Sequence, residues 1–248
     1  MAELGKRASG LTTGPRPAGA ADHDAYPRKV DGLIFGHNPA QGVFDGQKFL
    51  HPDLDLFIQF PPEWKIVNSP TAVGAHAVQG DAMIVLSSEG PGTDPLTPAA
   101  SLVAEMNQGF GLNPTRSEAL QVGSWPARLV AFQEQTGKDS ATLYFLWVAV
   151  KDQIYRMTGL SSDLRKDHLR RTAESFRHLT AEEKASIKVS RVRVVEAREG
   201  EDLQSFCWRT FNVLKPEGAA VMNGLETNAT LQAGQWMKIV AEESYLGL

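Results

Sequence analysis

The chain has 248 residues and a mass of 27.0 kDa, and 25 Lys and Arg against 29 Asp and Glu give it a formal charge of -4 at pH 7. This balance argues against a dedicated nucleic-acid-binding protein, which normally carries a basic surplus. Its 42% hydrophobic and 22% charged residues are typical of a globular protein, and no apolar run approaches the ~20 residues that cross a bilayer. The single cysteine, Cys207, excludes an intrachain disulfide and a cysteine-rich metal site.

The N-terminal residues 1–29 are rich in Gly, Ala and Pro and have no sustained hydrophobic period. We interpret them as a linker or as the tail of an upstream domain, with a disordered native N-terminus as the equal alternative. They lack the apolar stretch of a signal peptide, so the chain ends do not indicate a compartment.

The next segment alternates between a strand pattern and a helix pattern. Apolar residues at every second position predict a strand over 54–60, which the prolines at 61–62 end. Extended segments are expected at 64–67 and 82–86. A helical period then predicts a helix over 98–110, with Pro98 in its first turn and a glycine after its end.

Three strands are predicted to form a meander, at 125–135, 142–150 and 154–160. The middle strand is apolar on both faces, so we expect it in the interior of the sheet with a face covered by helices. Ser161 and Ser162 are suited to cap a helix that runs to about Leu179. Helices packed on an antiparallel sheet define an α+β fold.

The C-terminal part is predicted to be a separate small unit. A capping-box sequence at 180–183 indicates a short connecting helix. Beyond it, a strand at 192–197, two helix-compatible stretches and a strand at 236–241 make a βααβ order. We therefore predict a linker over 1–29, an α+β domain over 30–184 and a βααβ domain over 185–248.

No established catalytic or metal-binding motif is present. The sequence contains no HExxH, no GxSxG, no GxGxxG and no P-loop. We assign His168 and His178 to one helix, nearly three turns apart, and His51 with Asp53 to a turn rather than to a metal site. Cys207 lies in a predicted helix and is expected to be a buried, inert thiol. The prediction is therefore that the chain has no catalytic residues, no metal ligands and no cofactor of its own.

Three segments at the C-terminus carry a recognisable pattern. The sequence R-E-G-E-D-L at 198–203 follows a strand and opens a helix, N-G-L follows the second helix at 223–225, and L-Q-A-G-Q-W-M-K-I ends the unit at 231–239. This run resembles the LysM module. Gly200 and Gly234 allow tight turns, Asp202 can cap the first helix, and Asn223 can hold the loop after the second helix.

The LysM resemblance implies a shallow groove for N-acetylglucosamine chains. Two features depart from the family: its G-D-T triplet is G-E-D here, and the helical segment is about two residues longer than usual. Trp208 and Trp236 occur in core-like contexts, so we expect weak or absent binding of chitooligosaccharides. The groove would be lined by Gly200, Glu201, Asp202, Leu203, Asn223, Gly224 and Leu225.

The α+β region resembles PsbP-like domains in four short segments. These are F-L-H-P followed by F-I-Q-F-P-P-E-W within 49–64, G-S-W-P-A at 123–127, I-Y-R-M-T at 154–158 and E-S-F-R at 174–177. The resemblance implies a docking module. Tyr144, Trp147 and Tyr155 could form the floor of a partner pocket, although a place in the sheet core is the simpler expectation.

The order of the parts adds a third resemblance, over roughly residues 30–241. The string D-G-L-I-F-G-H-N-P-A-Q-G at 31–42, followed by the PsbP-like and LysM-like units, is similar to the C-terminal region of the BepA-like and Oma-like HExxH zinc metallopeptidases. In that family (metallopeptidase family forty-eight) the zinc ligands and the glutamate base lie in an upstream helical domain. The resemblance implies a bacterial periplasmic or cell-envelope location, with zinc only in that upstream domain.

Three hypotheses follow. The first is a non-catalytic accessory region that docks the upstream protease domain or its protein substrates, with tethering of the assembly to peptidoglycan as a secondary role. This hypothesis includes no nucleic-acid partner and no membrane span. The second is a stand-alone glycan- or protein-binding module of the cell envelope. The third is a hydrolase whose Ser, His and Asp groups converge only in space, which a structure without a Ser or Cys close to a His would exclude.

Overall fold

The computed structural model describes residues 29–247 except 70, 137–138 and 163–165, so nearly all of the expected linker lies outside the described residues. The expectation that Ser161 and Ser162 cap a helix is wrong, because both residues belong to a strand. The chain divides into two compact units. Of the described residues, the C-terminal unit comprises those in 29–36 and 190–242, and the large unit comprises those in 37–189 and 243–247. From the sequence we expected the domain boundary near residue 185, and the structure divides the chain after Val189.

A small antiparallel sheet opens the large unit after the 3-10 turn η1 (Pro39–Gln41). Its strands are β1 (Val43–Asp45), β2 (Lys48–His51) and β3 (Leu56–Gln59), and Phe49 of β2 lies opposite Ile58 of β3. The strand predicted over 54–60 is therefore shorter than expected. Residues 52–55 form a turn in which Asp55 has a positive φ of 56°.

The main sheet has seven antiparallel strands in the order β4-β5-β6-β10-β9-β8-β7. The predicted meander is confirmed, because β8, β9 and β10 are neighbours in sequence order. The strands β5 and β7 had no clear pattern in the sequence. The seven strands are β4 (Lys65–Asn68), β5 (Ala72–His76), β6 (Ala82–Pro91), β7 (Arg116–Val122), β8 (Trp125–Thr136), β9 (Asp139–Val150) and β10 (Gln153–Ser162).

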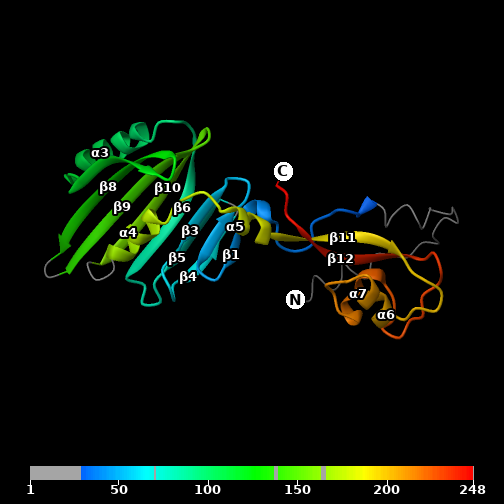
Figure 1. The fold of residues 1–248 in the computed structure, drawn as a ribbon. Helices are drawn as coiled ribbons and strands as arrows, with labels where there is room; N and C mark the ends of the chain where they lie inside the picture. The colour runs from blue at the N-terminus through cyan, green and yellow to red at the C-terminus, as the bar shows by residue number, and fades with distance from the viewer. Residues whose placement is uncertain (1–28, 70, 137–138, 163–165, 248) are drawn as a thin grey trace, which may run out of the picture. The chain divides into compact units, whose positions relative to one another are not determined.

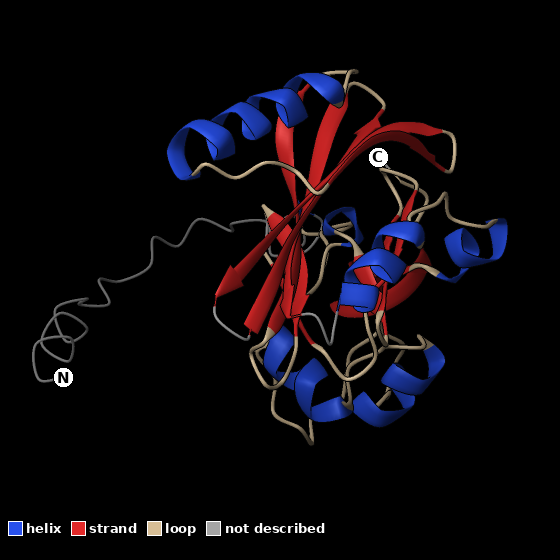
Figure 2. Ribbon diagram, turned by 90° about the vertical axis from the view of Figure 1, so that its left-hand side faces the viewer, coloured by secondary structure: helices blue, strands red, loops and turns tan. Residues whose placement is uncertain are grey.

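Both faces of β9 are buried, which explains its unbroken apolar sequence. Leu146 and Val148 point into the larger core of the unit, whereas Phe145 and Trp147 belong to a second core on the opposite face. The helix α3 (Leu96–Phe110) covers the second core, as Figure 2 shows for the helix that lies across one face of the sheet. The expected interior position of this strand is confirmed. The larger core is covered by α4 (Lys166–Glu174) and β3.

The helix α4 ends earlier than its sequence pattern predicts. Ser175 closes it, because its hydroxyl donates to the carbonyl of Thr172 and also accepts the amide N–H of Gln59 in β3. The chain then runs extended, and Arg177 forms a β-bridge with Phe57. The prediction that His168 and His178 share a helix is therefore wrong: His178 lies in the extended segment after the helix.

The predicted capping box is confirmed at α5 (Ala181–Ser186). The hydroxyl of Thr180 accepts the amide N–H of Glu183 at 3.1 Å, and the Glu183 carboxylate accepts the amide N–H of Thr180 at 2.9 Å. These two bonds satisfy helix-terminal donors that would otherwise lack partners. The short helix leads into the C-terminal unit.

The C-terminal unit has the predicted order of strand, two helices and strand (Figure 1). The strands β11 (Lys188–Glu196) and β12 (Trp236–Ser244) form a two-stranded sheet, and between them lie α6 (Leu203–Arg209) and α7 (Pro216–Asn223). Its small core includes Leu203, Phe206 and Ile239. The outermost residues of both strands are counted with the large unit. In the part of the chain that the structure describes, no helix combines the length and apolarity of a membrane span.

Candidate functional site

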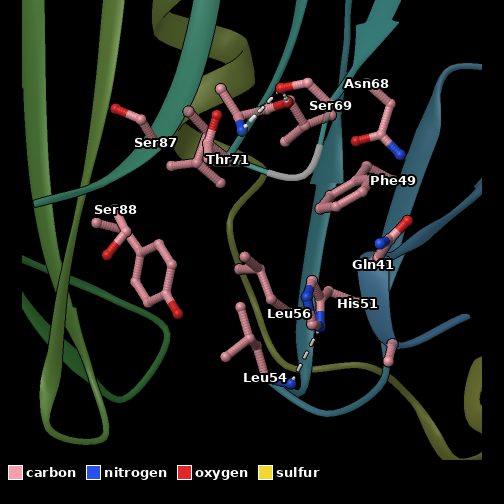
Figure 3. A pocket seen from close by; sticks show the side chains of 15 residues that line it. Gln41, Phe49, His51, Leu54, Leu56, Asn68, Ser69, Thr71, Ser87 and Ser88 are labelled. Carbon is pink, nitrogen blue, oxygen red and sulfur yellow. Dashed lines mark hydrogen bonds between the residues drawn. The ribbon is translucent and has the colours of Figure 1, made fainter. Parts of the chain in front are cut away.

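A cavity of about 450 Å³ lies in the large unit, lined by residues of both sheets (Figure 3). Its volume falls within the range of about 300–1,000 Å³ that is usual for ligand pockets. Apolar residues of β2, β3, β5 and β6 form part of the wall, and Tyr155 of β10 contributes its half-buried ring. The lining comprises Ala40, Gln41, Phe49, His51, Leu54, Leu56, Asn68, Ser69, Thr71, Ala72, Val73, Leu86, Ser87, Ser88 and Tyr155.

None of these lining residues is Asp, Glu, Lys or Arg. The polar part of the wall is instead made of hydroxyl and amide groups, several of which gather on one side of the cavity in Figure 3. Ser69 is held in place, because its hydroxyl donates to the carbonyl of Ala72 and accepts the Ala72 amide N–H. The cavity therefore suits an uncharged ligand that offers both apolar and hydrogen-bonding groups.

The wall of this cavity includes a histidine, His51, and histidine is the side chain whose ordinary pKa lies nearest to neutral pH. Burial lowers the pKa of His51, against the opposing effect of Asp53, and so favours the neutral ring. Its Nδ1 lies 3.3 Å from the amide nitrogen of Leu54, which donates to it. In the neutral ring the proton then resides on Nε2, which is left as a donor.

The described residues contain no group of three or more His, Cys, Asp or Glu side chains close enough to hold a metal ion. Cys207 is buried within the C-terminal unit, as predicted for an inert thiol. Burial raises the pKa of its thiol, which keeps the reactive thiolate scarce. Of the three aromatic residues expected at a pocket floor, only Tyr155 lines this cavity, whereas Trp147 is fully buried in the sheet.

In the C-terminal unit, the two loops of the predicted glycan groove have the expected glycines and cap. Gly200 has a φ of 72° in the first loop, and Gly224 has a φ of 66° as the C-cap of α7. Asp202 caps α6 as predicted, since its carboxylate accepts the amide N–H of Ser205 at 2.7 Å. Leu203 is buried and Leu225 packs against the same small core.

The polar side chains of the predicted groove are already engaged within the unit. Both carboxylate oxygens of Glu201 accept hydrogen bonds from the guanidinium of Arg209, which lowers the pKa of Glu201 despite the opposing effect of burial. Asn223 bonds to the backbone of Lys238 through both its amide oxygen and its amide nitrogen. These groups stabilise the fold, and a sugar would have to compete with those contacts.

The core-like position expected for Trp208 is wrong. Its side chain is 83% exposed, and that of Phe211 just after the same helix is 88% exposed. Leu203, Phe206 and Cys207 occupy the buried face of α6, and a rotation of about 100° per residue carries position 208 to the solvent side. Trp236, the other tryptophan of the unit, is half-buried.

One polar constellation was not visible in the sequence, because its members are far apart in the chain. Ser124 lies in the turn between β7 and β8, and its Oγ is 2.7 Å from Nε2 of His178. Nδ1 of the same ring is 3.0 Å from Oδ2 of Asp55. The structure therefore keeps the third hypothesis open, since a serine does lie within hydrogen-bond distance of a histidine.

No protein-family model and no curated protein matches the chain. Solved structures with similar architecture include a protein of Bacteroides thetaiotaomicron, with a TM-score of 0.39 and 10% identity over 62% of this chain. The chain spans 55% of the length of that protein. PsbP of the cyanobacterium Synechocystis, CyanoP, has a TM-score of 0.40 and 12% identity over 58% of this chain and 99% of its own.

LpqN of Mycobacterium tuberculosis, which is involved in cell envelope biogenesis, has a TM-score of 0.35 and 13% identity over 50% of this chain and 83% of its own. The α+β class, with a large antiparallel sheet and packed helices, is shown by the structure itself.

Proposed function

We propose that the chain is an accessory docking region of a cell-envelope zinc metallopeptidase, and that its large unit receives a segment of a partner or substrate protein. The observation that carries this proposal is the cavity of about 450 Å³ whose lining has hydroxyl and amide groups but no Asp, Glu, Lys or Arg. A peptide segment presents neutral backbone donors and acceptors together with apolar side chains, which match such a wall.

The C-terminal unit is proposed to act as a weak tether to peptidoglycan. Its βααβ order and the turn glycines Gly200 and Gly224 support this role, together with the LysM-like sequence. A weak tether raises the local concentration of an attached protease near its envelope substrates without taking part in bond cleavage. Zinc would be held by the upstream domain that the family resemblance implies.

The alternative is a stand-alone envelope module that binds glycan or protein. Reading the upstream coding sequence distinguishes the two proposals. An HExxH-containing helical domain in the same reading frame supports the accessory region. Its absence supports the stand-alone module.

Selection from a peptide library tests the docking proposal. We expect purified chain to select uncharged peptides, and isothermal titration calorimetry to give saturable binding. Ser88→Trp, which fills the cavity from β6, is expected to weaken that binding at least tenfold. Ser101→Trp on the exposed face of α3 is the matched control and should leave it unchanged. Equal binding by the Ser88→Trp variant, or no selected peptide at all, would contradict the proposal.

A further inference from the structure

The hydrogen bonds around His178 define which nitrogen carries its proton. An ionised carboxylate only accepts hydrogen bonds, so Asp55 Oδ2, at 3.0 Å, requires the proton on Nδ1. Nε2 of the neutral ring is then an acceptor, and the Ser124 hydroxyl at 2.7 Å donates to it. This is the order of groups found in Ser-His-Asp hydrolases, in which the histidine takes the serine proton.

Packing and hydrogen bonds hold all three groups in place. The other oxygen of Asp55, Oδ1, accepts the Lys184 ammonium at 2.8 Å and the amide N–H of Leu179 at 3.1 Å, which leaves Oδ2 facing His178. The ring of His178 lies against the buried Trp125, with 4.2 Å between ring centroids. Ser124 is presented by a two-residue hairpin turn in which Gly123 has a φ of 61°.

Two further features beside Ser124 bear on substrate binding. In the described part of the chain, the amide N–H groups of Gly123 and Ser124 donate to no acceptor, and the nucleophile's own N–H commonly binds the oxyanion in such enzymes. Gly123 also lines a cavity of about 200 Å³ beside this turn, whose wall combines apolar residues such as Val122, Tyr144 and Phe176 with the charged residues Arg116, Glu118, Arg170 and Glu174.

From this geometry we propose that Ser124 is an activated nucleophile that cleaves carboxylic esters, with His178 as general base and Asp55 as the positioning residue. Oγ attacks the ester carbonyl carbon as its proton passes to Nε2 of His178. The bond between the acyl carbon and the alcohol oxygen then breaks, and the alcohol leaves with that proton. Water attacks the acyl-serine, gives one proton to Nε2 and releases the carboxylic acid as Oγ regains the proton.

The exposure of the site sets the expected range of substrates. The side chain of His178 is 44% exposed, so water screens the charge that develops on the carbonyl oxygen. We therefore expect activated esters to react and amides not to. The residues involved line no part of the docking cavity, so the failure of one proposal leaves the other standing.

Covalent labelling of the full chain tests the proposal. A fluorophosphonate probe forms a bond between phosphorus and the serine oxygen and releases fluoride, and intact-mass analysis with peptide mapping locates the adduct. We expect a single adduct on Ser124, none in Ser124→Ala, and labelling slowed at least about 100-fold in His178→Gln. The control Ser117→Ala removes a serine hydroxyl that accepts from Arg128 rather than bonding a histidine, and should label normally.

The rates at which these variants hydrolyse p-nitrophenyl butyrate should rank in the same order as their labelling rates. Thermal unfolding followed by circular dichroism shows whether each variant is folded. Asp55→Ala should shift the ¹⁵N signals of the His178 ring toward the Nε2-protonated form and should also slow the labelling of Ser124, whereas the loss of a purely structural contact would leave the labelling rate of the folded variant unchanged. Folded wild-type chain without an adduct on Ser124 would overturn the proposal. Undiminished labelling of folded His178→Gln would overturn it as well.

Discussion

Asn223 and Lys238 are joined by two hydrogen bonds in the C-terminal unit. The amide N–H of Lys238 donates to Oδ1 of Asn223 at 2.8 Å, and Nδ2 of Asn223 donates to the carbonyl of Lys238 at 2.9 Å. The same Nδ2 also donates to the carbonyl of Ala219 at 2.9 Å. A residue expected to contact a sugar thus ties the end of α7 to β12.

Replacing Asn223 should therefore destabilise this unit. Asn223→Ala leaves the Lys238 backbone groups without their partner, which is expected to lower the free energy of unfolding by about 1–3 kcal/mol. Urea unfolding followed by circular dichroism measures the change. Asn228→Ala in the exposed turn after α7 is the matched control and should stay within about 0.5 kcal/mol of wild type.

Chitooligosaccharides are expected to bind weakly or not at all. The carboxylates of Glu201 and Asp202 are occupied by Arg209 and Ser205, so a sugar must compete with these bonds. Calorimetric titration should show no saturation at micromolar concentrations. Saturable micromolar binding would contradict this prediction and would favour a strong tether over a weak one.

Truncating the two aromatic residues of α6 should reduce the stability of the protein by very different amounts. Phe206 is fully buried, so Phe206→Ala is expected to cost about 3–5 kcal/mol of stability. Trp208 is 83% exposed, and Trp208→Ala should change stability by no more than about 0.5 kcal/mol. Thermal unfolding of both variants makes the comparison. A large loss in Trp208→Ala would restore the core position that its sequence context indicated.

Stability in acid should depend on the pair of Glu183 and Arg177. Hydrogen bonds from the Arg177 guanidinium lower the pKa of Glu183 from its ordinary 4.5 to about 2. Because the folded-state pKa is depressed, the contribution is fully present above about pH 4.5 and is lost as the pH falls toward about 2. Glu183→Gln should flatten the loss of stability across this interval. The neighbouring Glu182→Gln should leave the slope unchanged.

Replacing two glycines by alanine should change the stability of the protein in opposite directions. A Cβ on Gly159 in β10 would lie 2.8 Å from a methyl group of the fully buried Leu169, so Gly159→Ala is expected to cost about 1–3 kcal/mol. Gly109 in α3 is exposed and its Cβ would meet nothing within 4 Å, so Gly109→Ala should stabilise the fold by about 0.5–1 kcal/mol. Chemical denaturation of both variants checks the signs.

Local sequence patterns correctly predicted those secondary-structure elements that depend on residues close together in the chain. The capping box at Thr180, the glycine that ends α3 and the apolar strand β9 are all where the sequence placed them. The edge strand β7 was missed for a physical reason. In β7 most side chains are at least partly exposed, so the strand lacks the clear apolar alternation of a half-buried one.

The candidate sites depend on residues that are distant in sequence. The cavity joins Phe49 of one sheet to Tyr155 of another, and no motif marks a wall made of hydroxyl groups. The nearest sequence signal for Ser124 was its hairpin turn, which says nothing about a histidine 54 residues later. That histidine reaches the serine only because α4 stops at Glu174.

By itself the sequence determined the α+β class, the meander, the capping signals and the βααβ order, because side-chain periodicity and turn chemistry act over a few residues. Only the tertiary structure decided which polar groups meet. Helix termination at Ser175 depends on a bond to Gln59 across 116 residues, and that bond helps to bring Asp55, Ser124 and His178 together. The way α6 packs on the small core also exposes Trp208 while burying Phe206.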